Sequence, residues 1–287
     1  MRYYILTLLI IISHVSTAQI TLPSFQAVQY KGGGLPTLTT TAISDIAIET
    51  ATSGGNVTLA GSSSVIAKGI CWSTSTAPTT ALSTKTNDGT GTGSFSSSLT
   101  SLSPGVTYYV RAYATNGGGT AYGGQISFTT SALTIGSAYQ GGKVAYILAS
   151  GDAGYDPAVT HGFIVSTAVN VGQWQPSSSN LLSTSSAIGS GAANTATIFA
   201  ARGAGTYAAA LATDLVFNGY SDWYLPSLDE LNKVYQNRTA LSYSTSGSYW
   251  TSTQNDATTA WYINFATGSP TTRSTGTSWN APYCRSF

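Results

Sequence analysis

Few side chains in this chain could carry out acid–base, nucleophilic or metal chemistry. Its 287 residues include two histidines and two cysteines. A Ser-His-Asp triad would have to be built on His161, and a cysteine metal site needs more ligands than Cys71 and Cys284 provide. The adjacent acids Asp229 and Glu230 stand where a helix should start, a position that favours carboxylates without any catalytic role. We therefore expect no enzyme, no cofactor and no metal site.

The acidic pair belongs to a helix that we expect to begin at Ser227 and to end near Asn237. Serine followed three residues later by glutamate is a capping box, in which each side chain bonds the backbone N–H of the other residue. The apolar side chains that follow recur on one stripe of the helix. These residues are Leu228, Leu231, Val234 and Tyr235.

Contact with a sugar is the chemistry that the C-terminal half could perform. A sugar site offers an aromatic ring to the apolar face of the sugar, with amides and charged groups reaching its hydroxyls. We expect Trp223, Trp250 and Trp261 to lie in the core rather than against a ligand. Trp279 and Asn280 are better candidates, because they fall in a turn-rich segment between expected strands. The candidate ligand-binding residues are Trp279, Asn280, Arg273, Asp256, Tyr262 and Asn264.

The charge balance argues against some classes of partner. Charged residues make up 7% of the chain, against about 25% in an ordinary globular protein. Without the first 18 residues, which include Arg2 and His14, ten basic and ten acidic residues remain. Such a surface has little attraction for a phosphate backbone or an anionic membrane. We expect an extracellular glycan or protein as partner, and no nucleic acid or membrane.

The N-terminal segment predicts export. Arg2 is followed by an apolar run over residues 5–12 and by the small residues Ser16-Thr17-Ala18, which is the order of a secretory signal peptide. The run is too short for a membrane-spanning helix, which needs about 20 residues. We expect cleavage after Ala18 and a secreted, extracellular protein at the cell surface. Residues 19–35 then form an extended leader, which is either a flexible tether or a strand donated to a neighbouring subunit.

Residues 36–130 predict an all-β sandwich. Apolar and polar residues alternate over residues 56–60, 66–72 and 107–114, and clusters of Gly, Ser, Asn and Pro separate these runs. Short alternating runs with turn residues between them are typical of antiparallel sandwiches.

In this region the turn residues Leu102-Ser103-Pro104-Gly105 lead directly into the alternating run over residues 107–114. This stretch resembles the corresponding corner and strand of fibronectin type III-like domains. In that family one tyrosine turns its hydroxyl back onto the chain, and Tyr108 matches that position. Trp72 would then be a core aromatic residue, and Cys71 a partly shielded neighbour.

Residues 131–138 form an expected linker, and residues 139–287 an expected α+β domain. Mixed strand and helix patterns set this region apart from the alternating region before it. The strands are expected at 144–148, 162–167, 249–253, 260–265 and 283–287, and helices near 195–201 and over 207–217.

Several motifs follow one another in residues 139–287. They are Gln140-Gly141-Gly142-Lys143-Val144, His161-Gly162-Phe163-Ile164, Gly219-Tyr220-Ser221-Asp222-Trp223-Tyr224-Leu225-Pro226-Ser227 before Asp229-Glu230-Leu231, Tyr249-Trp250-Thr251-Ser252-Thr253, Ala260-Trp261 with Asn264-Phe265 and Gly268, and Tyr283-Cys284-Arg285-Ser286-Phe287. In this order they resemble the Lcl C-terminal domain family, a group of secreted bacterial modules named after a collagen-like adhesin. The closing strand also resembles that of the family, although Tyr283 stands in place of a basic residue.

The resemblance implies a fold similar to C-type lectins and formylglycine-generating enzymes, and attachment to glycans. The adhesin that names the family binds sulfated polysaccharides through a basic surface. Residues 133–287 carry six basic and seven acidic side chains, so a neutral glycan or a protein is the expected ligand. Gln175-Pro176-Ser177 and Trp279-Asn280-Ala281 keep fragments of a calcium-lectin loop but lack its carboxylates. Formylglycine-generating enzymes use two cysteines, of which this domain has Cys284 alone.

Two non-enzymatic functions follow from these observations. One is a surface adhesin that binds a glycan or a protein. The other is a structural subunit of an extracellular fibre or surface assembly that uses residues 19–34 as a donated strand, which the low charge favours. An enzyme built on Cys284 and His161 is a more distant third hypothesis.

Overall fold

The computed structural model describes residues 34–176 and 180–287. The expected signal peptide, residues 1–18, and residues 19–33 of the expected leader lie outside the described residues. The chain forms two compact units. The first consists of residues 34–46, Thr50–Ser101 and Thr107–Thr129, and the second of Ala47–Glu49, Leu102–Val106 and Thr130–Phe287.

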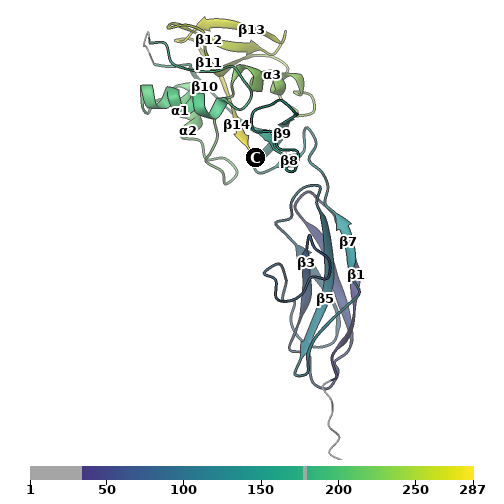
Figure 1. Ribbon diagram of the computed structural model, residues 1–287. Coiled ribbons are helices and arrows are strands. Elements are labelled where there is room, and N and C mark those ends of the chain that lie inside the picture. Colours follow the sequence, from purple (N-terminus) through teal and green to yellow (C-terminus); the bar gives the residue numbers. More distant parts are fainter. Residues whose placement is uncertain (1–33, 177–179) are drawn as a thin grey trace, which may run out of the picture. The chain divides into compact units, whose positions relative to one another are not determined.

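The first unit is a sandwich of two antiparallel sheets (Figure 1). Its strands are β1 (Thr37–Ser44), β2 (Ala51–Leu59), β3 (Ala67–Ser73), β4 (Gly93–Leu99), β5 (Thr107–Asn116), β6 (Gly119–Tyr122) and β7 (Ile126–Thr129). One sheet has the order β1-β2-β4. In the other, β5 pairs with β3 along one edge and with β6 and β7 along the other. The all-β sandwich that the alternating pattern predicts is confirmed.

Apolar side chains from both sheets fill the space between the two layers. Val57 and Leu99 come from one sheet, Ile70 and Val110 come from the other, and none is more than 1% exposed. Because strand side chains alternate between faces, neighbours such as Thr58 and Ser98 point to solvent. Full burial of a side chain of this size contributes about 1.5–3 kcal/mol.

The two aromatic residues that the sequence singles out in the sandwich, Trp72 and Tyr108, are buried. Trp72 lies on β3, and the ring of Tyr108 on β5 stacks on that of Phe128 at 6.0 Å. Cys71 is fully buried rather than partly shielded. The cause is the segment after β3, which folds back along that strand and pairs at Lys85 opposite Cys71.

The second unit is built on a mixed sheet with the order β13-β12-β11-β14-β10-β9-β8. Its neighbouring strands are antiparallel, except that β11 and β14 pair in parallel. The strands are β8 (Ala138–Tyr139), β9 (Gly142–Ile147), β10 (Gly162–Gln173), β11 (Ser248–Gln254), β12 (Thr259–Asn264), β13 (Ser269–Ser274) and β14 (Ser278–Ser286), and the helices are α1 (Gly191–Arg202), α2 (Ala208–Thr213) and α3 (Leu228–Gln236).

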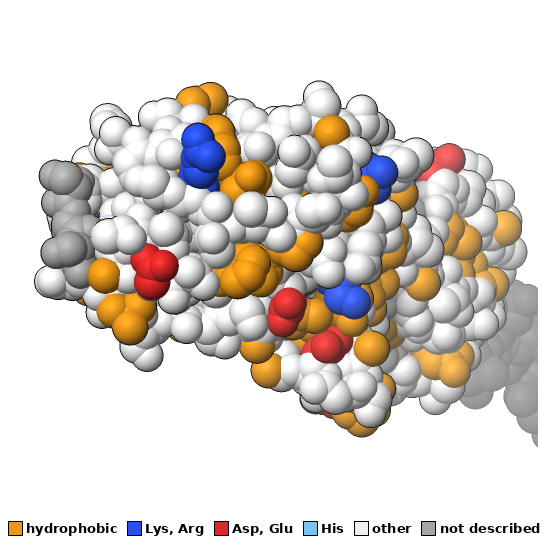
Figure 2. Space-filling view, turned by 90° about the horizontal axis from the view of Figure 1, so that it is seen from above, with side chains coloured by type: hydrophobic (Ala, Val, Ile, Leu, Met, Phe, Trp, Pro, Cys, Tyr) orange, Lys and Arg blue, Asp and Glu red, His pale blue; other side chains and the backbone are white. Residues whose placement is uncertain are grey.

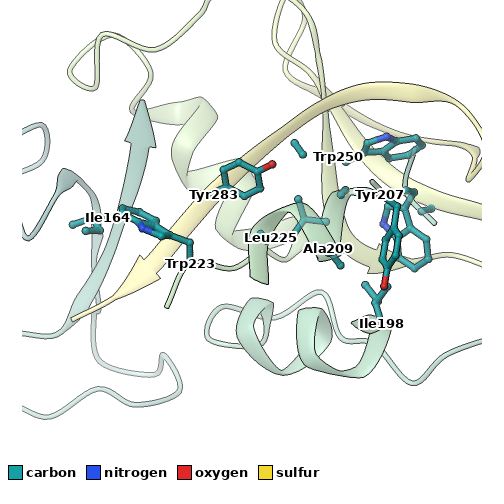
Figure 3. Close-up of a cluster of buried hydrophobic side chains, with 14 of the residues drawn as sticks. Ile164, Ile198, Tyr207, Ala209, Trp223, Leu225, Trp250 and Tyr283 are labelled. Carbon is teal, nitrogen blue, oxygen red and sulfur yellow. The ribbon is translucent and has the colours of Figure 1, made fainter. Parts of the chain in front are cut away.

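Helices lie against both faces of this sheet (Figure 1). α1 packs on β11 and α2 on β10 and β14, whereas α3 packs on β9, β11 and β12. The core is therefore in two layers: Tyr283 of β14 belongs to the layer of α1 and α2, and its neighbour Cys284 to the layer of α3. Figure 3 shows part of the first layer, with Trp250, Tyr207 and Ile198 gathered at one end.

The helix expected over residues 207–217 is shorter in the structure and ends at Thr213. Asn218 and Gly219 both have positive φ, and they form a tight turn across which Phe217 and Tyr220 exchange backbone hydrogen bonds of 2.9 and 3.1 Å. This turn brings the Phe217 ring to 5.9 Å from that of Trp223. The Asn-Gly pair therefore forms a tight turn beyond the helix. Packing of the Phe217 ring on Trp223 takes the place of the last helical turn that the sequence predicts.

The polar edge strand β13 is not predicted by the sequence. Its six residues are exposed or nearly so, and they include Pro270 and no alternating apolar residues. A strand that buries nothing leaves no period-two pattern to read. β13 pairs with β12 at the end of the sheet order.

The capping box of α3 is confirmed. The Ser227 Oγ accepts from the Glu230 N–H at 3.3 Å, and the Glu230 carboxylate accepts from the Ser227 N–H at 2.8 Å. The helix ends with Asn237 as its C-cap, where the sequence predicts it. Glu230 is only 1% exposed, so this cap is inside the domain.

Candidate functional site: an aromatic surface on the second unit

Three of the predicted ligand-binding residues come together at one end of the second unit's sheet. The rings of Tyr262 and Trp279 lie 3.9 Å apart between centroids and are tilted by 56°. The Arg273 guanidinium lies 6.0 Å from the centre of the Trp279 ring, at the limit of a cation–π contact. Tyr262 and Trp279 are partly exposed and Arg273 is exposed. We call Tyr262, Arg273 and Trp279 the aromatic surface.

Strand pairing places these side chains on one face. Directly opposite residues of antiparallel strands point to the same side of a sheet. Tyr262 is opposite Trp250, and Arg273 is opposite Ala260, two residues before Tyr262. Trp250 is fully buried and lies 5.0 Å from Trp279 between ring centroids. The buried Trp250 ring therefore packs against Tyr262 and Trp279 and fixes their positions.

Asn280 does not join the aromatic surface. The expectation that Trp279 and Asn280 lie in a turn is wrong, because β14 begins before both residues. Consecutive strand residues point to opposite faces, so Asn280 points away from Trp279. Its amide donates to the Ser248 carbonyl oxygen at 3.2 Å and ties β14 to β11.

Asn264 and Asp256 are held in turns. Asn264 ends β12, and its side-chain oxygen accepts from the Ala266 N–H at 2.9 Å. The Asp256 carboxylate accepts from the Thr259 hydroxyl at 2.7 Å and from the Thr258 N–H at 2.8 Å. These hydrogen bonds, that from the Thr259 hydroxyl above all, hold the pKa of Asp256 well below its usual range. A sugar hydroxyl would have to displace them to reach this carboxylate.

A buried polar network around β11 is absent from the sequence-based candidates. Gln254 accepts from the Leu182 N–H at 2.7 Å, and the Thr253 hydroxyl accepts from the Leu228 N–H at 3.0 Å. Both side chains are at least nine-tenths buried. Their role is to satisfy the backbone of the loop before α1 and of the first turn of α3. The signal for this role is a run of polar residues inside a buried strand.

Arg285 joins three of the motifs that resemble the Lcl family. Its guanidinium pairs with the Asp222 carboxylate, donates to the Gln140 side-chain oxygen at 2.5 Å, and lies 4.2 Å from the centre of the Tyr220 ring. These contacts link β14 to the turn between β8 and β9 and to the segment after α2. The motif residues here hold the fold together.

Both cysteines are free and buried. Burial raises the pKa of Cys71 to about 11 and that of Cys284 well above its usual value. The thiolate is the reactive form of cysteine, so we expect neither thiol of the folded protein to react with iodoacetamide near pH 8. Both should react in guanidinium, which mass spectrometry of the labelled protein will show. Labelling of the native protein at Cys284 would contradict the closed core.

Residues 34–176 and 180–287 contain no group of three or more His, Cys, Asp or Glu side chains that could hold a metal ion. Over the same residues no helix is both long enough and apolar enough to cross a membrane. His161 lies beside the end of β14, with its Nδ1 3.3 Å from the Phe287 carbonyl oxygen. The partly exposed rings of Tyr262 and Trp279, with the Arg273 guanidinium beside them, can contact a ligand by stacking and hydrogen bonding.

The fold and this surface define a protein with a β-sandwich followed by a mixed-sheet module. Residues 167–285 match the Lcl C-terminal domain family. The matched segment begins inside β10 and ends in β14, so it contains the whole aromatic surface.

Solved structures that are similar to part of the chain are sensor and fibronectin type III domains. The sensor domain of the anti-sigma factor RsgI4 of Pseudobacteroides cellulosolvens is 17% identical, with a TM-score of 0.27, over 34% of this chain and 96% of that chain. A fibronectin type III domain from human KIAA0970 is 14% identical, with a TM-score of 0.25, over 33% and 73%. The sixth such domain of human fibronectin type III domain containing protein 3 is 18% identical, with a TM-score of 0.27, over 37% and 91%. A comparison with curated proteins finds no match.

Proposed function

We propose that this protein is an extracellular adhesin whose second unit attaches to a neutral glycan through the aromatic surface. The observation that carries the proposal is the partly exposed Tyr262–Trp279 pair, which rests on the buried ring of Trp250. Aromatic rings bury the apolar face of a sugar, and a ring already fixed by packing loses little freedom on binding. Arg273, beside Trp279, can donate to sugar hydroxyls.

The low charge of the molecule supports a neutral ligand. Charged side chains are few and scattered on the face shown in Figure 2, where most of the surface is neutral. A polyanion is attracted by clustered Lys and Arg. Among the described side chains, Arg273 alone makes a cation–π contact with the Trp279 ring, which favours stacking over charge pairing.

The proposal includes export, a fold related to C-type lectins, and binding without catalysis. The order of charged, apolar and small residues in residues 1–18 supports export. A mixed sheet with helices on both faces, within a segment that matches the Lcl C-terminal domain, supports the related fold. The burial of Cys284 supports binding without catalysis, because a thiol with a raised pKa is a poor nucleophile.

A glycan array that includes neutral and sulfated glycans tests this function. The purified protein should bind neutral glycans, and the binding should persist in about 0.5 M salt, where charge pairing is screened. Binding confined to sulfated glycans and lost in that salt would overturn the proposal, and so would an array without hits.

A further inference from the structure

A cavity of about 250 Å³ lies on the α3 side of the sheet, opposite the side that carries the aromatic surface. Its polar lining comes from His161, Tyr224, Glu230 and Ser286. The Tyr224 hydroxyl lies 3.1 Å from the Ser286 hydroxyl. Phe163, which is 2% exposed, supplies an apolar wall. The cavity therefore combines hydroxyls, an imidazole and a carboxylate with an apolar side.

The carboxylate in this cavity is held by uncharged donors. One Glu230 oxygen accepts from the Gly189 N–H at 2.9 Å, and the other from the Ser227 N–H at 2.8 Å. The Gly191 N–H and the Tyr224 hydroxyl also interact with this carboxylate. Burial raises the pKa of Glu230, against these hydrogen bonds.

No basic side chain neutralises Glu230 within the part of the chain that the structure describes, where Arg285 and Asp222 form the ion pair. A buried charge without a partner is costly. A hard metal ion would need several oxygen ligands, and Glu230 belongs to no such group in residues 34–176 and 180–287. An ammonium group needs one carboxylate and a few further acceptors, which this cavity provides.

We propose that the cavity binds a small protonated primary amine, with its ammonium group against Glu230 and its body between Phe163 and the hydroxyls of Tyr224 and Ser286. The volume lies below the about 300 Å³ at which pockets for drug-sized ligands begin, so the ligand has the size of a monosaccharide or an amino acid. This site is separate from the glycan-binding surface, and either site can exist without the other.

Titration of the full protein with glucosamine, glucose and N-acetylglucosamine, followed by ligand-observed NMR, tests the inference. Glucosamine should bind with a Kd below about 20 mM. Glucose and N-acetylglucosamine, which have no protonated amine, should not bind. Glu230→Gln removes the charge and should weaken glucosamine binding at least about tenfold. Ser227→Ala is the matched control, because it breaks the same cap but keeps the carboxylate, and it should bind like the wild type.

A second variant covers the case in which Glu230→Gln does not fold. Ala153 is exposed and lines the cavity, so Ala153→Phe narrows the cavity without touching the core. This variant should fold and lose glucosamine binding. Equal binding by the wild type and Ala153→Phe, or equal binding of glucose and glucosamine, would overturn the inference. No binding of glucosamine to the wild type would do the same.

Discussion

Replacement of Trp250 by alanine should lower the free energy of unfolding of the second unit by about 4 kcal/mol. The side chain is fully buried, and its ring lies 5.0 Å from that of Trp279 and 6.1 Å from that of Tyr262. Its Nε1–H donates to the Gly172 carbonyl oxygen at 3.2 Å. The variant leaves a large cavity between α1 and the sheet and an unsatisfied carbonyl in it.

Urea unfolding, monitored by far-UV circular dichroism, measures this loss. Trp261→Ala is the control, because Trp261 lies on the same hairpin but is partly exposed, and its loss should be at most about half as large. A Trp250→Ala variant within about 1 kcal/mol of the wild type would contradict the assignment of this ring to the core.

Glu230→Ala should cost the second unit about 3 kcal/mol. The change leaves the N–H groups of Ser227 and Gly189 without the partner they have in the structure, and each buried unsatisfied group costs about 1–3 kcal/mol. Ser227→Ala removes the other half of the capping box and should cost about 1 kcal/mol. Urea unfolding measures both losses in the free energy of unfolding. Equal losses in the two variants would show that the buried carboxylate stabilises the helix no more than an ordinary exposed cap.

The same residue predicts a pH dependence. Burial raises the pKa of Glu230 above its ordinary 4.5, so the folded state holds this proton more tightly than the unfolded state. The contribution of Glu230 to stability is complete below pH 4.5 and declines as the pH rises through the pKa of the folded state. We therefore expect the free energy of unfolding of Glu230→Gln, relative to that of the wild type, to increase as the pH rises. Unfolding of both proteins at a series of pH values measures this difference. A difference that stays constant would contradict the raised pKa.

Signals confined to a few neighbouring residues predict the structure well. The capping box at Ser227 and Glu230 predicts the start of α3, since its hydrogen bonds form within one turn, and the apolar stripe that follows predicts the end near Asn237. Alternating apolar residues predict β3 and β5 of the sandwich, because the side chains on one face of each strand fill the space between the two sheets. Trp250, within a run of strand-forming residues, is buried as predicted.

Features that depend on distant partners are not predictable in the same way. Cys71 is buried by a segment that returns along β3, and nothing around Cys71 in the sequence indicates that segment. β13 has no buried face, so no pattern of apolar residues in the sequence indicates that it pairs with β12. The first half of β14 is not predictable from the sequence, because the polar and small residues around Trp279 are typical of a turn. Pairing with β10 makes these residues a strand.

The aromatic surface, too, is predictable from the sequence only in part. The residue types of Tyr262, Arg273 and Trp279 point to sugar contact, but the register of β11 and β12 decides which of the six candidates meet. Alternation within β14 separates Asn280 from Trp279, and turn hydrogen bonds occupy Asp256. The cavity beside Glu230 is formed by segments far apart in the chain, so the sequence shows only its helix cap.

Isothermal titration of the wild type and of Trp279→Ala with the strongest array glycan tests the central claim most directly. Trp279 is partly exposed on the aromatic surface, so its loss should leave the fold intact and weaken binding at least about tenfold, as expected for an aromatic residue at the centre of an interface. Trp261→Ala, on the opposite face of β12, should bind like the wild type. Equal affinities of Trp279→Ala and the wild type would contradict binding through this surface.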